Sequence, residues 1–171
     1  MQEDKYKDAA LLIYELMQDT FGEEYSYFLG SPVMLAQSAY PCIVIQSISS
    51  NNTVQNAPTG HDVVSEQINI HILMSEMSVE QADDSIETTM RTLYNIVQGR
   101  DSTTGFYQSG TAMFALRTNL EFTNPITKLP TVVDHDIDIN YDVTPTPGKP
   151  TIIEAILTLV TRERMPVPNR Y

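Results

Sequence analysis

The segment Val63–Met74, VVSEQINIHILM, decides the fold that the sequence predicts. Apolar and polar residues take alternate positions along it. The apolar set is Val64, Ile68, Ile70, Ile72 and Met74, and the polar set is Ser65, Gln67, Asn69 and His71. Successive side chains of a strand point to opposite faces of a sheet. The segment therefore predicts a strand with one buried face and one wetted face.

A second strand is predicted just before it, over Tyr40–Ile48, YPCIVIQSI. Its continuous apolar centre is typical of a strand buried on both faces. Cys42 lies within this run, so we expect it to pack as a small hydrophobe and not to act as a nucleophile. Asn51–Gly60 contains Asn-Asn, Pro58 and Gly60, which indicates a long loop.

Two amphipathic helices are expected to cover the sheet. In Asp4–Asp19 the apolar residues recur at steps of three and four, and Gly22 is a plausible stop. Ser78–Gln98 opens with a capping box, Ser78 to Gln81, and continues with an apolar stripe. Acidic residues crowd the early turns of this helix and arginines come late, as the helix dipole favours.

Two later strands and a terminal element complete the prediction. Thr111–Phe122 and Thr131–Val143 both show alternation, which is cleanest in the second. Residues 144–150, TPTPGKP, read as a stiff linker. Residues 152–160 have apolar spacing that also fits a helix, but their β-branched residues favour a strand.

These elements predict an α+β fold: a mainly antiparallel sheet of about four to five strands, with two helices packed on one face. We expect residues 1–143 to form a single domain and residues 144–171 to form a Pro-rich linker and C-terminal extension. The edges of such a sheet would be open. Open edges must be covered or paired, which points to assembly.

Composition restricts the function. The chain has 171 residues and a formal net charge of −12. A chain so acidic is unsuited to wrapping nucleic acid, because phosphate neutralisation needs a basic face. A single cysteine excludes an intrachain disulfide and fits a reducing compartment. No run approaches the roughly 20 apolar residues of a bilayer span, so we expect a soluble cytoplasmic product with no membrane partner.

The charge is unevenly distributed. Residues 1–148 hold 20 acidic and six basic side chains, a balance of −14, while residues 149–171 have a balance of +2. The basic end contains Arg162, Arg164 and Arg170, set among Pro166 and Pro168. We consider these arginines candidates for an inter-subunit tail. The alternative is a frayed terminus whose charges only aid solubility.

A row of acids on one face of the Thr131–Val143 strand is the main candidate site. The row is Asp134, Asp136, Asp138 and Asp142. Hard cations favour carboxylate oxygens, so a small metal-binding or enzymatic domain that uses Asp134, Asp136 and Asp138, with or without His135, is one hypothesis. However, side chains at i and i+2 on a strand are about 7 Å apart, and the glycine and glutamate of a calcium loop are missing. A solvated face, or an acidic wall at an interface or lumen, fits better.

No catalytic signature is present. The chain has no G-x-S-x-G or G-x-G-x-x-G motif, and Gly148-Lys149 runs into Pro150 where a phosphate-binding loop needs Ser or Thr. His61, His71 and His135 lack metal-ligand spacing. We therefore predict no enzymatic activity, no cofactor and no metal. A generic adaptor for a protein partner remains a further alternative.

The layout resembles the tail terminator (tail-completion, neck) proteins of long-tailed bacteriophages. The resemblance rests on the helix Asp4–Asp19, the strand YPCIVIQSIS, the strand Val63–Met74, the capped helix Ser78–Gln98, the two later strands and the Pro-rich terminus. It implies an α+β subunit that forms a six-fold homo-oligomeric ring at the head-proximal end of the tail tube.

On this resemblance the ring stops tube polymerisation and joins the tail to the head. Its partners would be further copies of itself, the tail tube protein and the head-tail connector proteins. DNA would pass through the lumen without specific binding. The implied location is the tail or neck of the virion, after synthesis in the host cytoplasm. The resemblance carries no catalytic residues.

Overall fold

The computed structural model describes residues 5–32, 39–54, 61–76, 82–145 and 147–166. Within them the chain forms three α-helices, one short 3-10 helix and seven strands. In chain order the elements are α1 (Ala9–Phe21), η1 (Gly22–Glu24), β1 (Ser26–Leu29), β2 (Cys42–Val54), β3 (His61–Glu76), α2 (Ala82–Gln98), α3 (Ala112–Thr118), β4 (Glu121–Thr123), β5 (Pro130–Val133), β6 (Asp138–Thr144) and β7 (Thr151–Pro166).

All seven strands belong to one mixed sheet. Six of them follow the order β1-β2-β3-β7-β5-β4, and β6 pairs with β7 outside this order. β7 pairs with β3 along one edge, and its other edge is shared by β6 and β5 in succession. Only the β1–β2 pair is parallel, and the other pairs are antiparallel. The predicted α+β class is confirmed. The sheet has more strands than expected because short strands join both of its sides.

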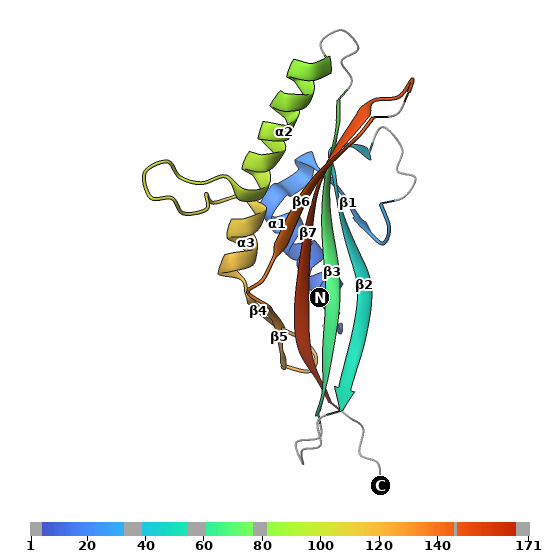
Figure 1. Cartoon of the computed structure of the whole chain (residues 1–171). Helices are drawn as coiled ribbons and strands as arrows, with labels where there is room; N and C mark the ends of the chain where they lie inside the picture. The colour runs from blue at the N-terminus through green and yellow to red at the C-terminus, as the bar shows by residue number, and fades with distance from the viewer. Residues whose placement is uncertain (1–4, 33–38, 55–60, 77–81, 146, 167–171) are drawn as a thin grey trace.

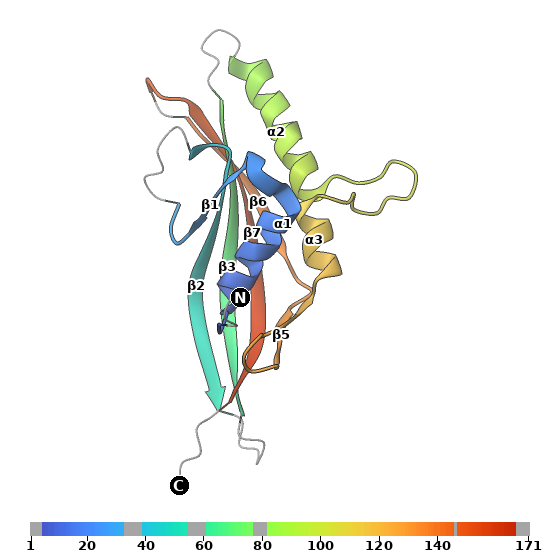
Figure 2. The ribbon, with the colours of Figure 1, turned by 180° about the vertical axis from the view of Figure 1, so that it is seen from behind.

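The helices pack on one face of the sheet, where the main core lies. The core combines inward-facing residues of β2, β3 and β7, such as Ile45, Ile70 and Leu157, with residues of the helices, such as Ile13 of α1 and Leu93 of α2. Figure 1 shows α1 behind the sheet, and Figure 2 shows it in front. The expectation of helices on one face is therefore correct, with three helices in place of two.

Capping interactions define both ends of α1. Asp8 is its N-cap, and the Asp8 carboxylate accepts a hydrogen bond from the Leu11 N–H at 2.8 Å. Gly22 follows the last residue with a φ of +68°, and its N–H donates to the Gln18 carbonyl. The predicted stop at Gly22 is confirmed. The capping box predicted at Ser78–Gln81 lies outside the described residues.

The strand predicted over Thr111–Phe122 is wrong. Ala112–Thr118 is α3, and only Glu121–Thr123 forms a strand, β4. The Thr111 side chain caps α3 by accepting from the Phe114 N–H at 3.2 Å. The buried residues are Ala112, Met113, Ala115 and Leu116, a helical spacing. Apolar residues also alternate at the even positions of this segment. The N-cap at Thr111 and the helix-forming residues after it nevertheless favour a helix over a strand.

The strand predicted over Thr131–Val143 is two strands. β5 ends at Val133 and β6 begins at Asp138, with irregular backbone between them. Both strands pair with β7, β5 through Thr131–Val133 and β6 through Asp138–Thr144. The chain leaves the edge of β7 after Val133, opposite Thr161, and rejoins it at Asp138, opposite Thr158. Residues 26–29 form β1, which lies parallel to the start of β2.

The expected C-terminal extension is inside the sheet. Residues Thr151–Pro166 form β7, which confirms the strand favoured for residues 152–160. β7 pairs with β3 from Thr151 to Pro166, and Leu157 and Leu159 are fully buried. The composition suggested a boundary at residues 144–150, where the chain instead turns from β6 into β7. Residues 167–171 lie outside the described residues.

The molecule is elongated along β2, β3 and β7. These three strands run past the helices at one end, where β3 begins and β2 and β7 end (Figures 1 and 2). At the other end lie α2 and the β6–β7 turn. The segment between α2 and α3 projects sideways, on the side opposite β2 in both views. In the described part of the chain, no helix has the length and apolar character needed to cross a membrane.

β7 offers a direct test of its central position. Leu157→Ala removes a fully buried side chain and should lower the free energy of unfolding by about 2–5 kcal/mol. Arg164→Ala, an exposed position on the same strand, should change it by no more than about 0.5 kcal/mol. Urea denaturation of both variants makes the comparison. Equal, small effects would show that β7 does not contribute to the core.

Candidate functional site

Several of the polar residues that the sequence singled out lie on the open face of the sheet. It is the face turned away from the helices, and it presents alternate residues of each strand. In β3 these include Ser65, Asn69 and His71, and in β7 they include Glu154, Thr158 and Arg162. The register places Asn69 opposite Thr158 and Ser65 opposite Arg162. The face is therefore polar over much of its length.

The four aspartates do not form one row. Asp134 and Asp136 lie in the connection between β5 and β6, and Asp138 and Asp142 lie in β6. Asp136, Asp138 and Asp142 are exposed, while Asp134 is half-buried. The row predicted along one continuous strand is thus divided by the break at residues 134–137. Only Asp138 and Asp142 share a strand face, at a spacing of about 13 Å.

This division removes the geometry that a shared metal ion needs. Among the residues that the structure describes, no group of three or more His, Cys, Asp or Glu side chains could hold a metal ion. His135 is exposed, and its carbonyl accepts a hydrogen bond from Arg117. It does not join the aspartates into a ligand set.

Arg162 and Asp134 meet within one chain. The guanidinium Nη2 of Arg162 lies 3.0 Å from Oδ2 of Asp134, across the β5–β7 edge. The Asp134 N–H also donates to the Val160 carbonyl at 2.8 Å, which places the carboxylate beside β7. An arginine of the predicted basic tail thus pairs with an aspartate of the predicted acidic row. Arg164 is exposed on β7 opposite Val63, and Arg170 lies outside the described residues.

A buried polar cluster crosses the three central strands on the open face. His71 of β3 is 5% exposed. Its Nδ1 is 2.5 Å from Oε1 of Glu154 in β7, and its Nε2 is 3.0 Å from Oε1 of Gln46 in β2. The sequence placed His71 on the polar face of its strand but did not predict its two partners. One alternating strand carries no information about the strands beside it.

The cluster fixes the register of the three central strands relative to one another. His71 satisfies both ring nitrogens against neighbours from two different strands, so it fixes the side-by-side position of β2, β3 and β7. A one-residue slip of any of these strands would leave a buried polar group without its partner, at a cost of about 1–3 kcal/mol.

Cys42 packs as a small hydrophobic residue, as the sequence predicts. It is completely buried, beside Val44 and Leu73. Burial, with a contribution from Glu154, raises the pKa of the Cys42 thiol to about 11. The thiol is therefore protonated at neutral pH and is a poor nucleophile.

A buried carboxylate, that of Glu163, lies on the helix side of β7. Glu163 is 6% exposed, and the Tyr6 hydroxyl lies 3.0 and 2.9 Å from its two oxygens and donates to them. Burial raises the pKa of Glu163, opposed by the Tyr6 hydrogen bond and supported by the nearby charges of Glu66 and Asp8. The contact ties the segment before α1 to the far end of β7.

The edge of β2 is open over most of its length. β1 covers only Cys42–Ile45. From Gln46 to Thr53, β2 has no neighbour on the side away from β3 among the described residues. The segment QSISSNNT contains no charged residue and no proline, the usual features that prevent an edge from pairing. Its one irregularity is the β-bulge between Ser47 and Ser49, where Ile48 is exposed.

Comparison with models of protein families and with characterised proteins finds no match to this chain.

The His71 cluster predicts a specific pattern of stability. His71→Leu leaves the half-buried side chains of Glu154 and Gln46 without their shared partner, so it should destabilise the protein by about 1–3 kcal/mol. The double variant His71→Leu/Glu154→Met replaces the pair with apolar groups and should recover most of this loss. Chemical denaturation of the single and double variants measures the effect. A double variant that is no more stable than His71→Leu would contradict the assigned role.

Glu163 predicts a pH dependence. Its raised pKa means that the folded chain binds a proton more readily than the unfolded chain. Its contribution to stability is therefore present below the unfolded pKa of about 4.3 and is lost as pH rises through the folded value. Glu163→Gln keeps an acceptor for Tyr6 but does not titrate. Relative to this variant, the wild-type chain should lose stability as pH rises from about 4 to 7, as measured by thermal melts. A difference that is constant or drifts the other way would refute the assignment.

Proposed function

We propose that this chain is a structural virion protein, a tail terminator subunit that assembles into a ring on the tail tube and joins the tail to the head. The observation that carries the proposal is the long, uncharged edge of β2 at residues 46–53, which pairs with no other described strand, in a sheet that extends past its helices. An edge of this kind is a template for pairing with another chain. A protein that used its sheet only as a scaffold for a small-molecule site would need no such edge.

The arrangement of the two sides of the molecule supports a head-to-tail contact. β2 and its open edge lie on one side, and the segment between α2 and α3 projects from the other (Figures 1 and 2). Contacts between two different surface patches are heterologous, and they close into a ring when the rotation between copies permits. The resemblance noted from the sequence implies the same kind of assembly.

The charge of the molecule is compatible with DNA passing through such a ring. The chain has a net charge of −12, and Asp138 and Asp142 are exposed on β6. Negative surface repels phosphate and forms none of the ion contacts that hold proteins on nucleic acid. A lumen lined by such side chains would let DNA slide without binding it.

Negative-stain electron microscopy of the purified chain tests the proposal. The expected result is a hollow six-fold ring, or rings formed at the end of added tail tubes. Introducing lysines on the open edge, as Ser49→Lys/Asn51→Lys, should prevent ring formation without unfolding the chain. Asn119→Lys, at the exposed end of α3, is the matched control. A chain that forms no ring, alone or with tail tubes, would exclude this function.

A further inference from the structure

The segment between α2 and α3 presents an aromatic side chain to solvent. Phe106 is 76% exposed, the most exposed of the large hydrophobic side chains in the described chain. It lies in the loop Gly99–Gly110, which projects away from the body of the molecule on the side opposite β2 (Figures 1 and 2). Exposed aromatic side chains of this kind are the usual anchors of protein interfaces.

Hydrogen bonds within the loop fix the conformation of its backbone. The Gln108 N–H donates to the Gly99 carbonyl and the Asp101 N–H donates to the Phe106 carbonyl, each at 2.8 Å. The Asp101 carboxylate accepts from the N–H groups of Thr103 and Thr104 at 2.9 and 2.8 Å. Gly105, with a φ of +74°, makes the tight turn that an L side chain would strain. Phe106 is thus presented in a fixed position, which lowers the entropic cost of binding.

The base of the loop is fixed to the core. The Arg100 guanidinium lies 4.9 Å from the centroid of the Tyr107 ring, and Tyr107 packs against the main core. Phe106 is therefore next to an anchored residue and cannot fold back into the body without breaking these contacts.

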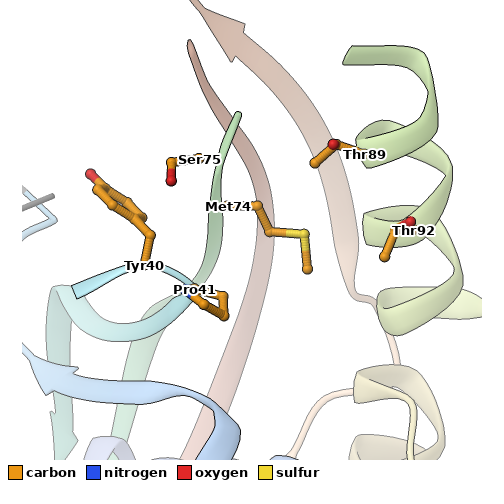
Figure 3. A pocket seen from close by; sticks show the side chains of 6 residues that line it. All are labelled: Tyr40, Pro41, Met74, Ser75, Thr89 and Thr92. Carbon is orange, nitrogen blue, oxygen red and sulfur yellow. The ribbon is translucent and has the colours of Figure 1, made fainter. Parts of the chain in front are cut away.

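A cavity of about 270 Å³ lies between α2 and the ends of β2 and β3. Figure 3 shows its lining: Tyr40 and Pro41 on one side, Met74 and Ser75 on β3, and Thr89 and Thr92 on α2. Its volume is below the roughly 300–1,000 Å³ of small-molecule pockets and suits a single large side chain. Tyr40, Pro41 and Met74 are the partners that an aromatic ring packs against.

The cavity is preformed. The Thr89 hydroxyl of α2 donates to the Glu76 carboxylate of β3 at 2.7 Å, which holds the two walls at a set distance. The cavity also borders the start of β2, the strand whose open edge continues beyond Ile45.

The absence of charge on the two surfaces favours the loop of another copy as the occupant of the cavity. Copies of a chain with a net charge of −12 repel each other overall, so a contact between two uncharged surfaces avoids adding close like-charge pairs. Residues 102–116 contain no charged side chain, and none of the six residues that line the cavity is charged. The tip of the loop and the six residues that line the cavity are thus two uncharged surfaces of one acidic molecule.

We infer that Phe106 of one copy inserts into the cavity between Tyr40, Met74 and Thr92 of the next copy, as a heterologous contact that propagates around a ring. This inference rests on the proposed ring and names the contact that builds it. Because the two surfaces differ, each copy offers one anchor and one cavity.

Two variants test the two surfaces of the contact, the Phe106 anchor and the cavity, one at a time. Phe106→Ala removes the anchor, and Thr92→Trp fills the cavity from an exposed position on α2. Each variant alone should remain monomeric in sedimentation velocity under conditions in which the wild-type chain assembles. Ile126→Ala, which removes an apolar side chain that is 50% exposed on another turn, is the control and should assemble as the wild type does. Thermal melts should show that all three variants are folded.

Mixing the two variants gives the decisive result. The Thr92→Trp chain still has Phe106, and the Phe106→Ala chain still has an open cavity, so a mixture should form a dimer and nothing larger. Rings formed by Phe106→Ala alone, a mixture that stays monomeric, or a wild-type chain that stays monomeric at its highest soluble concentration would overturn the contact. Rings that form without Phe106 would leave the proposed function intact, so the two proposals can fail separately.

Discussion

The antiparallel pairing of β3 with β7 is the interaction on which the rest of the structure depends. Sixteen residue pairs join the two strands, from His61 opposite Pro166 to Glu76 opposite Thr151. Two helices and three strands separate them along the chain, so the pairing must overcome the entropy of closing a long loop. The apolar inner face provides the compensation, because Ile68, Ile70 and Leu157 are buried under the helices. All the remaining strands then attach to this pair directly or through a neighbour.

The same pairing redistributes the charge of the molecule. Along the sequence, the arginines of the last 23 residues look like a basic tail attached to an acidic body. In the fold, Arg162 lies in β7 and pairs with Asp134. An exposed ion pair of this kind contributes little to stability, about 0–1 kcal/mol. Its larger effect is on recognition, because it neutralises a charge that would otherwise be available to a partner. The proposed assembly therefore uses uncharged surfaces: the edge of β2, and Phe106 with the cavity proposed to receive it.

The elements that the sequence predicted well are those whose burial follows one local period. β3 and α1 were found because a single strand or helix face shows in its own residues which side is buried. Thr111–Phe122 was misassigned because Ala112, Phe114 and Leu116 satisfy a period of two while Ala112, Met113 and Leu116 satisfy a helix. The N-cap at Thr111 was the deciding signal, and it was available in the sequence. The break between β5 and β6 had no comparable signal, since both strands continue the same alternation.

The sequence by itself determined the α+β class, the placement of helices on one face, the burial of Cys42 and the stop of α1 at Gly22, because each follows from backbone periodicity or capping within a few residues. Only the tertiary structure decided that residues 151–166 lie at the centre of the sheet, that His71 joins Glu154 and Gln46, and that the aspartates are divided between a connection and a strand. The physical reason is that strand pairing is a contact between distant segments. An alternating strand specifies which of its faces is buried, but its partners depend on which other strands share the same core.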